Sequence, residues 1–164
     1  MDKVSFVKMK NFRSRYLRGM KNLSVCDVGS LDVNGSYRFI FLDHRYTGVD
    51  IAPGPNVDVV TEPYTYPFRD EAFDVVISGG TIEHVFDMFR WIVELKRILK
   101  KDGWMCIIAP SLHGHHAYPV DCWRIYPDGM KFLLGEVAGL EVHKAVQHTS
   151  IKGEVSCIGV GRRL

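Results

Sequence analysis

The sequence has no run of 18 apolar residues, the length at which an apolar segment indicates a helix that crosses a membrane. Near the N-terminus, basic side chains interrupt every apolar stretch, which leaves no room for the apolar part of a signal peptide. We therefore expect no membrane partner and a cytoplasmic location. The 164 residues have the composition of an ordinary globular protein, and their number predicts one domain.

The sequence also lacks C-x-x-C motifs. Its cysteines are Cys26, Cys106, Cys122 and Cys157. Three of them lie within apolar runs, so we expect reduced and mostly buried thiols. An H-x-H-H motif is formed by His113, His115 and His116, but no second pair of ligands stands at zinc-finger spacing. We therefore predict that these histidines line a polar pocket and that the protein binds no metal.

Acidic residues are nearly absent from residues 1–22, which carry seven basic side chains and the single acid Asp2. Apolar residues recur there every three or four positions, at Phe6, Met9, Phe12, Tyr16 and Met20. This pattern predicts an amphipathic helix over 1–22. Its basic side could contact a phosphate-bearing partner. We favour the simpler interpretation, a face exposed to solvent.

The rest of the chain alternates between strand-like and helix-like runs. The predicted strands are SVCDV, YTGVDI, VDVV, FDVVIS, WMCIIAP, LEVHKAV and VSCIGVG. The first five are continuous apolar runs, typical of parallel strands that helices cover on both faces. We predict one helix over 87–101, capped by Asp87 and ended by Asp102-Gly103, and another from Pro127 to about Ala138. The fold class is therefore α/β.

The three-glycine fingerprint G-x-G-x-x-G of dinucleotide-binding folds is missing. After the first strand only Gly29 and Gly35 are present, and Leu31 stands at the position of the second glycine. A strand that runs into a glycine turn still indicates a nucleotide site, because glycine lets the backbone bend and a ligand approach.

Acids follow three of the early strands: Asp27, Asp50 and Glu62. Asp50 stands 23 residues after Asp27, about where dinucleotide folds place the acid that binds ribose hydroxyls. An anionic Asp27 beside the glycine turn suits an ammonium group better than a pyrophosphate, because like charges repel in a dehydrated site. A nucleoside joined to a cationic amino acid fits both ends of this acidic site, with its ribose at Asp50 and its ammonium at Asp27. S-adenosylmethionine is such a ligand.

The ordered series VCDVGSLDVNGSYR, YTGVDI, TEPYTYPF, FDVVISGGTIEHV and LKRILKKDGWMCIIAPS resembles the motifs of class I S-adenosylmethionine-dependent methyltransferases, in particular the type 11 branch. The resemblance covers residues 23–112. It implies a Rossmann-like, doubly wound and mostly parallel sheet of seven strands, with helices on both faces and the last strand antiparallel. S-adenosyl-L-methionine is the implied cofactor.

The resemblance also implies roles for individual residues. Asp27, Gly29 and Ser30 would hold the methionine part of the cofactor, Asp50 would bind its ribose, and Glu62 would face its adenine. Ser78 and Gly79 would border the methionine and the sulfonium. Ile51 and Pro63 are further expected cofactor-binding residues. The sequence departs from the family pattern at Leu31 and at Glu62, where an aspartate is more frequent.

Methyl transfer to a neutral amine or hydroxyl requires a base near the methyl group. His84 follows the fourth strand, and His113 and His116 follow the fifth; His113 is our preferred base because it is nearest to a strand end. The loop over 113–126 also holds Tyr118, Asp121, Trp123 and Arg124. We predict that this loop binds the acceptor. For single residues the structural alternative has equal weight: Trp123 covers the core, and Asp121 pairs with Arg124.

No Asn-Pro-Pro-Tyr-like motif, which is frequent in methyltransferases that act on planar nitrogens, follows the fourth strand. Together with the lack of an added nucleic-acid-binding domain, this favours a small-molecule acceptor such as a sugar, a polysaccharide precursor or a secondary metabolite. The alternatives are a nucleic-acid or protein methyltransferase and a non-catalytic partner protein that binds the cofactor. A homodimer is left open. We divide the single domain into the helix 1–22, the cofactor core 23–112, the acceptor loop 113–126 and the C-terminal part 127–164.

Overall fold

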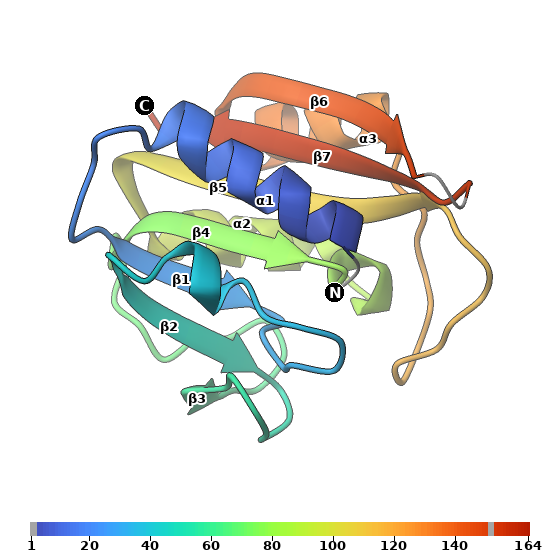
Figure 1. Cartoon of the computed structure of the whole chain (residues 1–164), viewed down its shortest axis with the longest axis horizontal. Coiled ribbons are helices and arrows are strands. Elements are labelled where there is room, and N and C mark those ends of the chain that lie inside the picture. Colours follow the sequence, from blue (N-terminus) through green and yellow to red (C-terminus); the bar gives the residue numbers. More distant parts are fainter. Residues whose placement is uncertain (1–2, 151–152) are drawn as a thin grey trace.

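The computed structural model describes residues 3–150 and 153–164. The centre of the fold is a seven-stranded sheet (Figure 1). The strands are β1 (Ser24–Val28), β2 (Arg45–Asp50), β3 (Val59–Val60), β4 (Phe73–Gly79), β5 (Leu99–Leu112), β6 (Glu141–Thr149) and β7 (Val155–Arg162). Their order in the sheet is β3-β2-β1-β4-β5-β7-β6. The first five strands pair in parallel, and β7 is antiparallel to both β5 and β6. The predicted fold class, including the antiparallel last strand, is confirmed.

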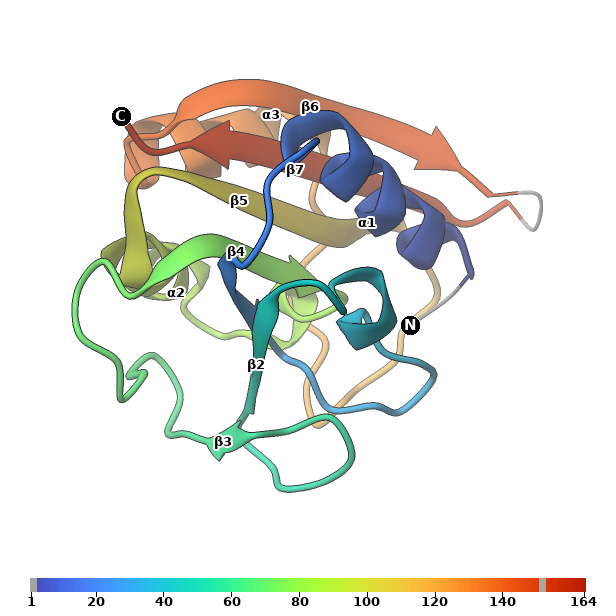
Figure 2. The same ribbon diagram turned by 60° about the vertical axis from the view of Figure 1, so that its left-hand side comes forward.

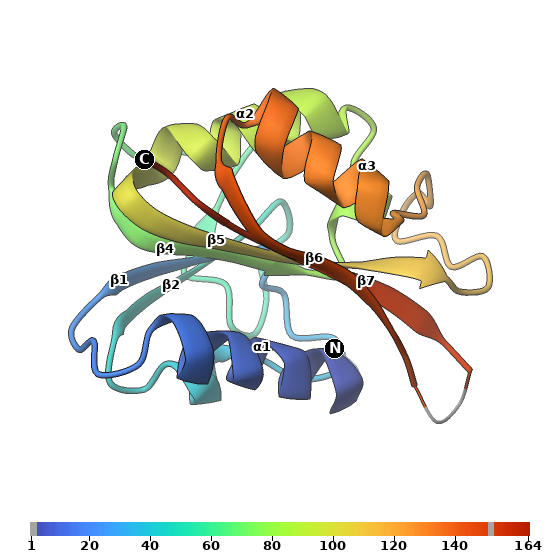
Figure 3. The same cartoon turned by 90° about the horizontal axis from the view of Figure 1, so that it is seen from above.

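Helices cover both faces of the sheet, as Figure 3 shows with the sheet seen edge-on. Helix α1 (Lys3–Tyr16) and the short helix η1 (Arg38–Ile40) pack on one face. Helix α2 (Met88–Ile98) packs on the other, together with α3 (Pro127–Lys131), which continues as the π-helix η3 (Phe132–Val137). A further short helix, η2 (Ile82–His84), follows β4. The predicted helix from Pro127 is confirmed, although its second half is a π-helix.

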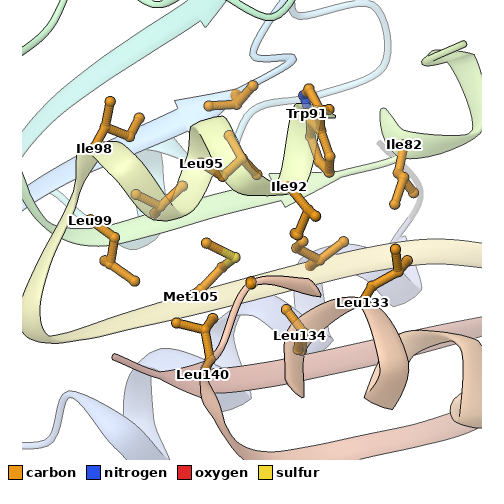
Figure 4. Close-up of a cluster of buried hydrophobic side chains, with 14 of the residues drawn as sticks. Ile82, Trp91, Ile92, Leu95, Ile98, Leu99, Met105, Leu133, Leu134 and Leu140 are labelled. Carbon is orange, nitrogen blue, oxygen red and sulfur yellow. The ribbon is translucent and has the colours of Figure 1, made fainter. Parts of the chain in front are cut away.

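Helix α2 anchors the larger core cluster, with four side chains that point at the sheet and at η3 (Figure 4). These are Trp91, Ile92, Leu95 and Ile98, each no more than 2% exposed. Burial of such side chains contributes about 1.5–3 kcal/mol each. The predicted cap is also present, because the Asp87 carboxylate accepts a hydrogen bond from Arg90 N at 3.0 Å.

The predicted end of this helix at residue 101 is wrong. The helix ends at Ile98, because Leu99 already pairs with Phe73 as the first residue of β5. Lys100 therefore lies on a strand, where its ammonium binds Asp74 at 2.7 Å instead of interacting with the helix dipole. Asp102, with a φ of 62°, bends the strand instead of ending the helix.

The N-terminal helix is shorter than the predicted 1–22. It ends at Tyr16, and Met20 lies beyond it with 44% of its surface exposed. Met9 and Phe12 are buried against the sheet as the pattern indicated. Figure 2 shows how α1 lies across β5 and β7. In the part of the chain that the structure describes, no helix combines the length and apolar character needed to span a membrane.

Candidate functional site

A cavity of about 860 Å³ lies at the carboxyl ends of β1, β2, β4 and β5. Its walls come from the turns that follow these strands, from the loop after β5 and from the first turn of α1. Ligands bind at this edge in open α/β sheets, because the strand order reverses here and leaves a crevice. The candidate site is therefore built from segments that are far apart in the sequence.

The turn after β1 depends on glycine at position 29. Gly29 has a φ of 79°, and its N–H donates to Val49 O at 2.8 Å. A Cβ at this position would lie 2.0 Å from Oγ1 of Thr81, so the close approach of two cavity-lining turns excludes any side chain. Ser30 follows, buried and on the cavity wall, with its hydroxyl donating to Asn56 O at 3.2 Å.

Asp27 is a buried carboxylate at the base of the cavity, only 2% exposed. The Tyr46 hydroxyl donates a hydrogen bond to its Oδ2. Oδ1 has no hydrogen-bond partner within residues 3–150 and 153–164. Burial raises the pKa of Asp27 to about 7, and the hydrogen bond from Tyr46 and the charge of Arg38 oppose this rise. A cationic group in the cavity would stabilise the ionised carboxylate.

Asp50, at the end of β2, is fixed by two backbone donors. Leu31 N donates to Oδ2 at 3.1 Å, and Ala52 N donates to Oδ1 at 3.2 Å. Each oxygen keeps a free lone pair, so the carboxylate can still accept hydrogen bonds from a vicinal diol. Leu31 thus contributes its N–H to the site, while its side chain packs against Gly54.

The segment after β3 places Thr61, and not Glu62, on the cavity wall. Glu62 is exposed and is absent from the cavity lining, so the geometry lends no support to its predicted role. The Thr61 hydroxyl is buried and has no hydrogen-bond partner in the described ranges. Pro63 lines the same part of the cavity, as does Ile51, which is 55% exposed.

The end of β4 has a packing role and a cavity-lining role. Ser78 is buried below the wall, and its hydroxyl donates to Val28 O at 2.6 Å, which ties β4 to β1. Gly79 lines the cavity. A Cβ on Gly79 would lie 2.2 Å from the Tyr37 hydroxyl, another group on the wall.

Histidines from two loops meet at the far end of the cavity. His84 lies in η2, whereas His116 and His113 lie in the loop after β5, and all three line the cavity. The ring centroids of His84 and His116 are 5.1 Å apart, and those of His113 and His116 are 4.4 Å apart. Glu83 precedes His84 in η2, is 2% exposed and also lines the cavity; burial raises its pKa to about 7.

The loop 113–126 divides into residues that line the cavity and residues that hold the loop. Tyr118 lines the cavity and is 56% exposed. Asp121 pairs with Arg124 at 2.6 Å, which lowers the pKa of Asp121, and it accepts a hydrogen bond from His116 N at 2.8 Å. Trp123 packs against the core and donates from Nε1 to Val85 O at 2.6 Å. Asp121, Trp123 and Arg124 are not in the cavity lining.

A family model described as a methyltransferase domain, of type 11, matches residues 26–107, which is half of the chain. The chain belongs to this family of S-adenosylmethionine-dependent methyltransferases. The match begins within β1 and ends within β5, so it covers the ends of β1, β2 and β4 that contribute to the cavity, but not the end of β5.

Known methyltransferases are similar to this chain in sequence or in fold. An uncharacterized methyltransferase of Schizosaccharomyces pombe is 36% identical over 56 residues, which are 34% of this chain and 20% of that protein. The matched segment is thus about a fifth of that relative's length. The Burkholderia thailandensis 1,6-didemethyltoxoflavin N1-methyltransferase, solved with bound 1,6-didemethyltoxoflavin and S-adenosylhomocysteine, superposes with a TM-score of 0.80 at 17% identity, covering 99% of this chain and 79% of that one.

A second solved structure with this fold is geranyl diphosphate C-methyltransferase from Streptomyces coelicolor, in complex with Mg²⁺, geranyl diphosphate and S-adenosylhomocysteine. Its TM-score is 0.71 at 13% identity, with 96% of this chain and 77% of that one covered. At such low identities these structures establish the fold of the methyltransferase.

The residues present fit the cofactor of the family. The ammonium of S-adenosylmethionine would meet the unpartnered Oδ1 of Asp27, and the ribose diol would meet the oriented carboxylate of Asp50. The unpartnered Thr61 hydroxyl lies on the same wall as Ile51 and Pro63, where a purine needs an apolar surface and a polar contact. The cofactor supplies an electrophilic methyl group on a sulfonium.

Among the cavity-lining residues that sequence reasoning missed are Tyr37, Thr61 and Glu83. Thr61 is adjacent to the predicted Glu62, and Glu83 is adjacent to the predicted His84, so the segments were found but not the side chains that face the cavity. Nothing in the sequence pattern marks Tyr37, which follows a polar loop.

Proposed function

We propose that this methyltransferase transfers the methyl group of S-adenosylmethionine to an oxygen or nitrogen atom of a small molecule. The observation that carries the proposal is one continuous cavity. It extends from Asp27 and Asp50, which suit the two ends of the cofactor, to His84, His113 and His116. Its volume of about 860 Å³ is within the range of small-molecule sites, roughly 300–1,000 Å³.

In this proposal Asp27 binds the cofactor's ammonium and Asp50 binds its ribose, while Gly29 and Gly79 let Thr81 and Tyr37 pack closely at the cavity wall. Methyl transfer depends mainly on positioning, so the site would have to hold the acceptor atom near the methyl carbon and exclude water. Tyr118, on the exposed side of the cavity, would contact the acceptor.

His113 is the proposed base. Its Nδ1 is 2.9 Å from Gly114 O, which accepts a hydrogen bond and so leaves the Nε2 lone pair available. Oε1 of Glu154 lies 3.7 Å from this Nε2 and would stabilise the imidazolium that forms once a proton is taken. The arrangement of a cavity-lining imidazole and a carboxylate supports proton removal from an acceptor.

The proposal is tested by incubating the purified protein with S-adenosylmethionine and a panel of acceptors, and by measuring S-adenosylhomocysteine. The panel contains sugars, phenols and amines on one side, and RNA, DNA and unfolded protein on the other. We expect turnover with members of the first group. Turnover confined to the macromolecules would contradict the small-molecule proposal.

A further inference from the structure

Three side chains with metal-binding atoms converge at one end of the cavity. Glu83 and His84 come from η2 after β4, and His116 comes from the loop after β5. Nε2 of His84 and Nε2 of His116 each lie 3.9 Å from Oε1 of Glu83. One ligand atom from each of the three residues lies within 4.8 Å of the others.

The second nitrogen of each histidine is already bonded to the protein. Nδ1 of His84 is 2.5 Å from Val120 O, and Nδ1 of His116 is 3.0 Å from Gly114 O. A carbonyl oxygen can only accept, so each Nδ1 carries the hydrogen and each Nε2 presents a lone pair. Outer hydrogen bonds of this kind fix the tautomer and orientation of metal-binding histidines.

Glu83 is a buried carboxylate whose charge the described residues compensate only in part. Its Oε2 has no hydrogen-bond partner in the described part of the chain, although the residue is only 2% exposed. The nearby guanidinium of Arg124 is bonded to both oxygens of Asp121. A buried carboxylate without compensation is costly, and a bound cation would supply the missing charge.

We propose that Glu83, His84 and His116 bind one divalent transition-metal ion. Two nitrogen ligands and one carboxylate favour an ion such as Zn²⁺ over Mg²⁺, which prefers oxygen ligands alone. Two atoms 3.9 Å apart can both bind an ion at about 2.1 Å, so the geometry needs only small side-chain rotations. All three residues line the cavity, which leaves open positions on the ion for a ligand.

The role of the ion rests on the proposed function and narrows its acceptor to a hydroxyl compound. A hydroxyl bound to the ion ionises more readily, because the metal stabilises the oxyanion. The O–H bond breaks, and the proton goes to Nε2 of His113, which is not a ligand. The oxygen then bonds to the methyl carbon while the carbon–sulfur bond breaks with its electrons left on sulfur. The products are a methyl ether and S-adenosylhomocysteine.

The proposal is tested by titration calorimetry of the full, metal-free chain with Zn²⁺ in the absence of cofactor. A parallel titration with Mg²⁺ serves for comparison. The variants are Glu83→Gln and His116→Ala, and the control is His115→Ala. His115 belongs to the same H-x-H-H motif, is exposed and does not line the cavity. Because Glu83 is buried, a loss of the fold in its variant would not test the site. His116, with its side chain 36% exposed, gives an independent answer.

We expect one Zn²⁺ per chain, binding weakened more than about tenfold in both variants, and no change in His115→Ala. Absence of Zn²⁺ binding, or equal binding in His116→Ala and wild type, would overturn the metal site. The same proteins are titrated with S-adenosylhomocysteine without metal. Binding of S-adenosylhomocysteine without binding of Zn²⁺ refutes the metal site alone. Binding of Zn²⁺ without binding of S-adenosylhomocysteine refutes the proposed function.

Discussion

The backbone N–H of Leu31 donates a hydrogen bond to Oδ2 of Asp50 at 3.1 Å, which joins the turn after β1 to the end of β2. The carboxylate is thereby oriented before any ligand arrives, so a ribose diol can bind without reorganising the site. Leu31 takes the place of a family glycine, and its backbone still performs this task.

Asp50→Ala should weaken S-adenosylhomocysteine binding by about a hundredfold, because two hydrogen bonds to a charged group are lost. Titration calorimetry measures the change. Asp128→Ala is the matched control, since Asp128 lies exposed on α3, away from the cavity lining, and its carboxylate pairs with Lys131 at 3.2 Å. Near-normal affinity in Asp50→Ala would contradict the site assignment.

Gly29→Ala should lower the free energy of unfolding by about 2–4 kcal/mol, because a left-handed backbone and a clash with Thr81 act together. Gly19→Ala is the control. Gly19 has the same φ of 79°, but a Cβ there meets no atom within 4 Å. Gly19→Ala should therefore lower the free energy of unfolding, measured in urea, by only about 1–2 kcal/mol. Equal losses in the two variants would show that the turns after β1 and β4 are not closely packed.

Stability without cofactor should fall as the pH rises from about 4 to 7. The pKa of Asp27 is about 7 in the folded protein and about 3.9 in an unfolded chain, so the folded state binds the proton more tightly. The stabilisation that this proton gives is complete below the pKa of Asp27 in the unfolded chain. It is lost as the pH rises through the pKa of Asp27 in the folded protein. Between pH 5 and 7, wild type should lose about 2 kcal/mol more than Asp27→Asn in urea unfolding. Equal losses of unfolding free energy in wild type and Asp27→Asn would show that the environment of Asp27 is more polar than the structure indicates.

Trp123→Ala should destabilise the protein by about 2–4 kcal/mol, because a packed indole and its hydrogen bond to Val85 O are removed. Tyr118→Ala, in the same loop but exposed and on the cavity wall, should stay within about 0.5 kcal/mol of wild type. Urea unfolding compares the two. Normal stability of Trp123→Ala would contradict the packing role and would favour the predicted role of Trp123 in acceptor binding.

Much of the fold follows from the sequence because apolar runs report burial directly. The segment SVCDV coincides with β1, and the stripe of α2 faces the core. The element ends were harder to predict. Leu99 was assigned to a helix because it fits the helical period, but pairing with β4 takes precedence, and no local pattern reveals that pairing.

The site was predicted as segments more readily than as side chains. Strand ends of a parallel sheet meet at one edge, so Asp27 and Asp50 could be placed together from the sequence. The cluster of Glu83, His84 and His116 could not, because it joins two loops whose relative positions depend on the tertiary fold. Zinc-finger spacing, the criterion applied to the H-x-H-H motif, does not account for ligands that come from a second loop.

Titration calorimetry of the purified protein with S-adenosylmethionine, S-adenosylhomocysteine and NADH tests the central claim most directly. The acidic cavity predicts micromolar binding of the first two ligands, which carry an ammonium and a ribose diol, and no binding of NADH, whose pyrophosphate would face Asp27. Binding of NADH, or of none of the three, would contradict the account of the site.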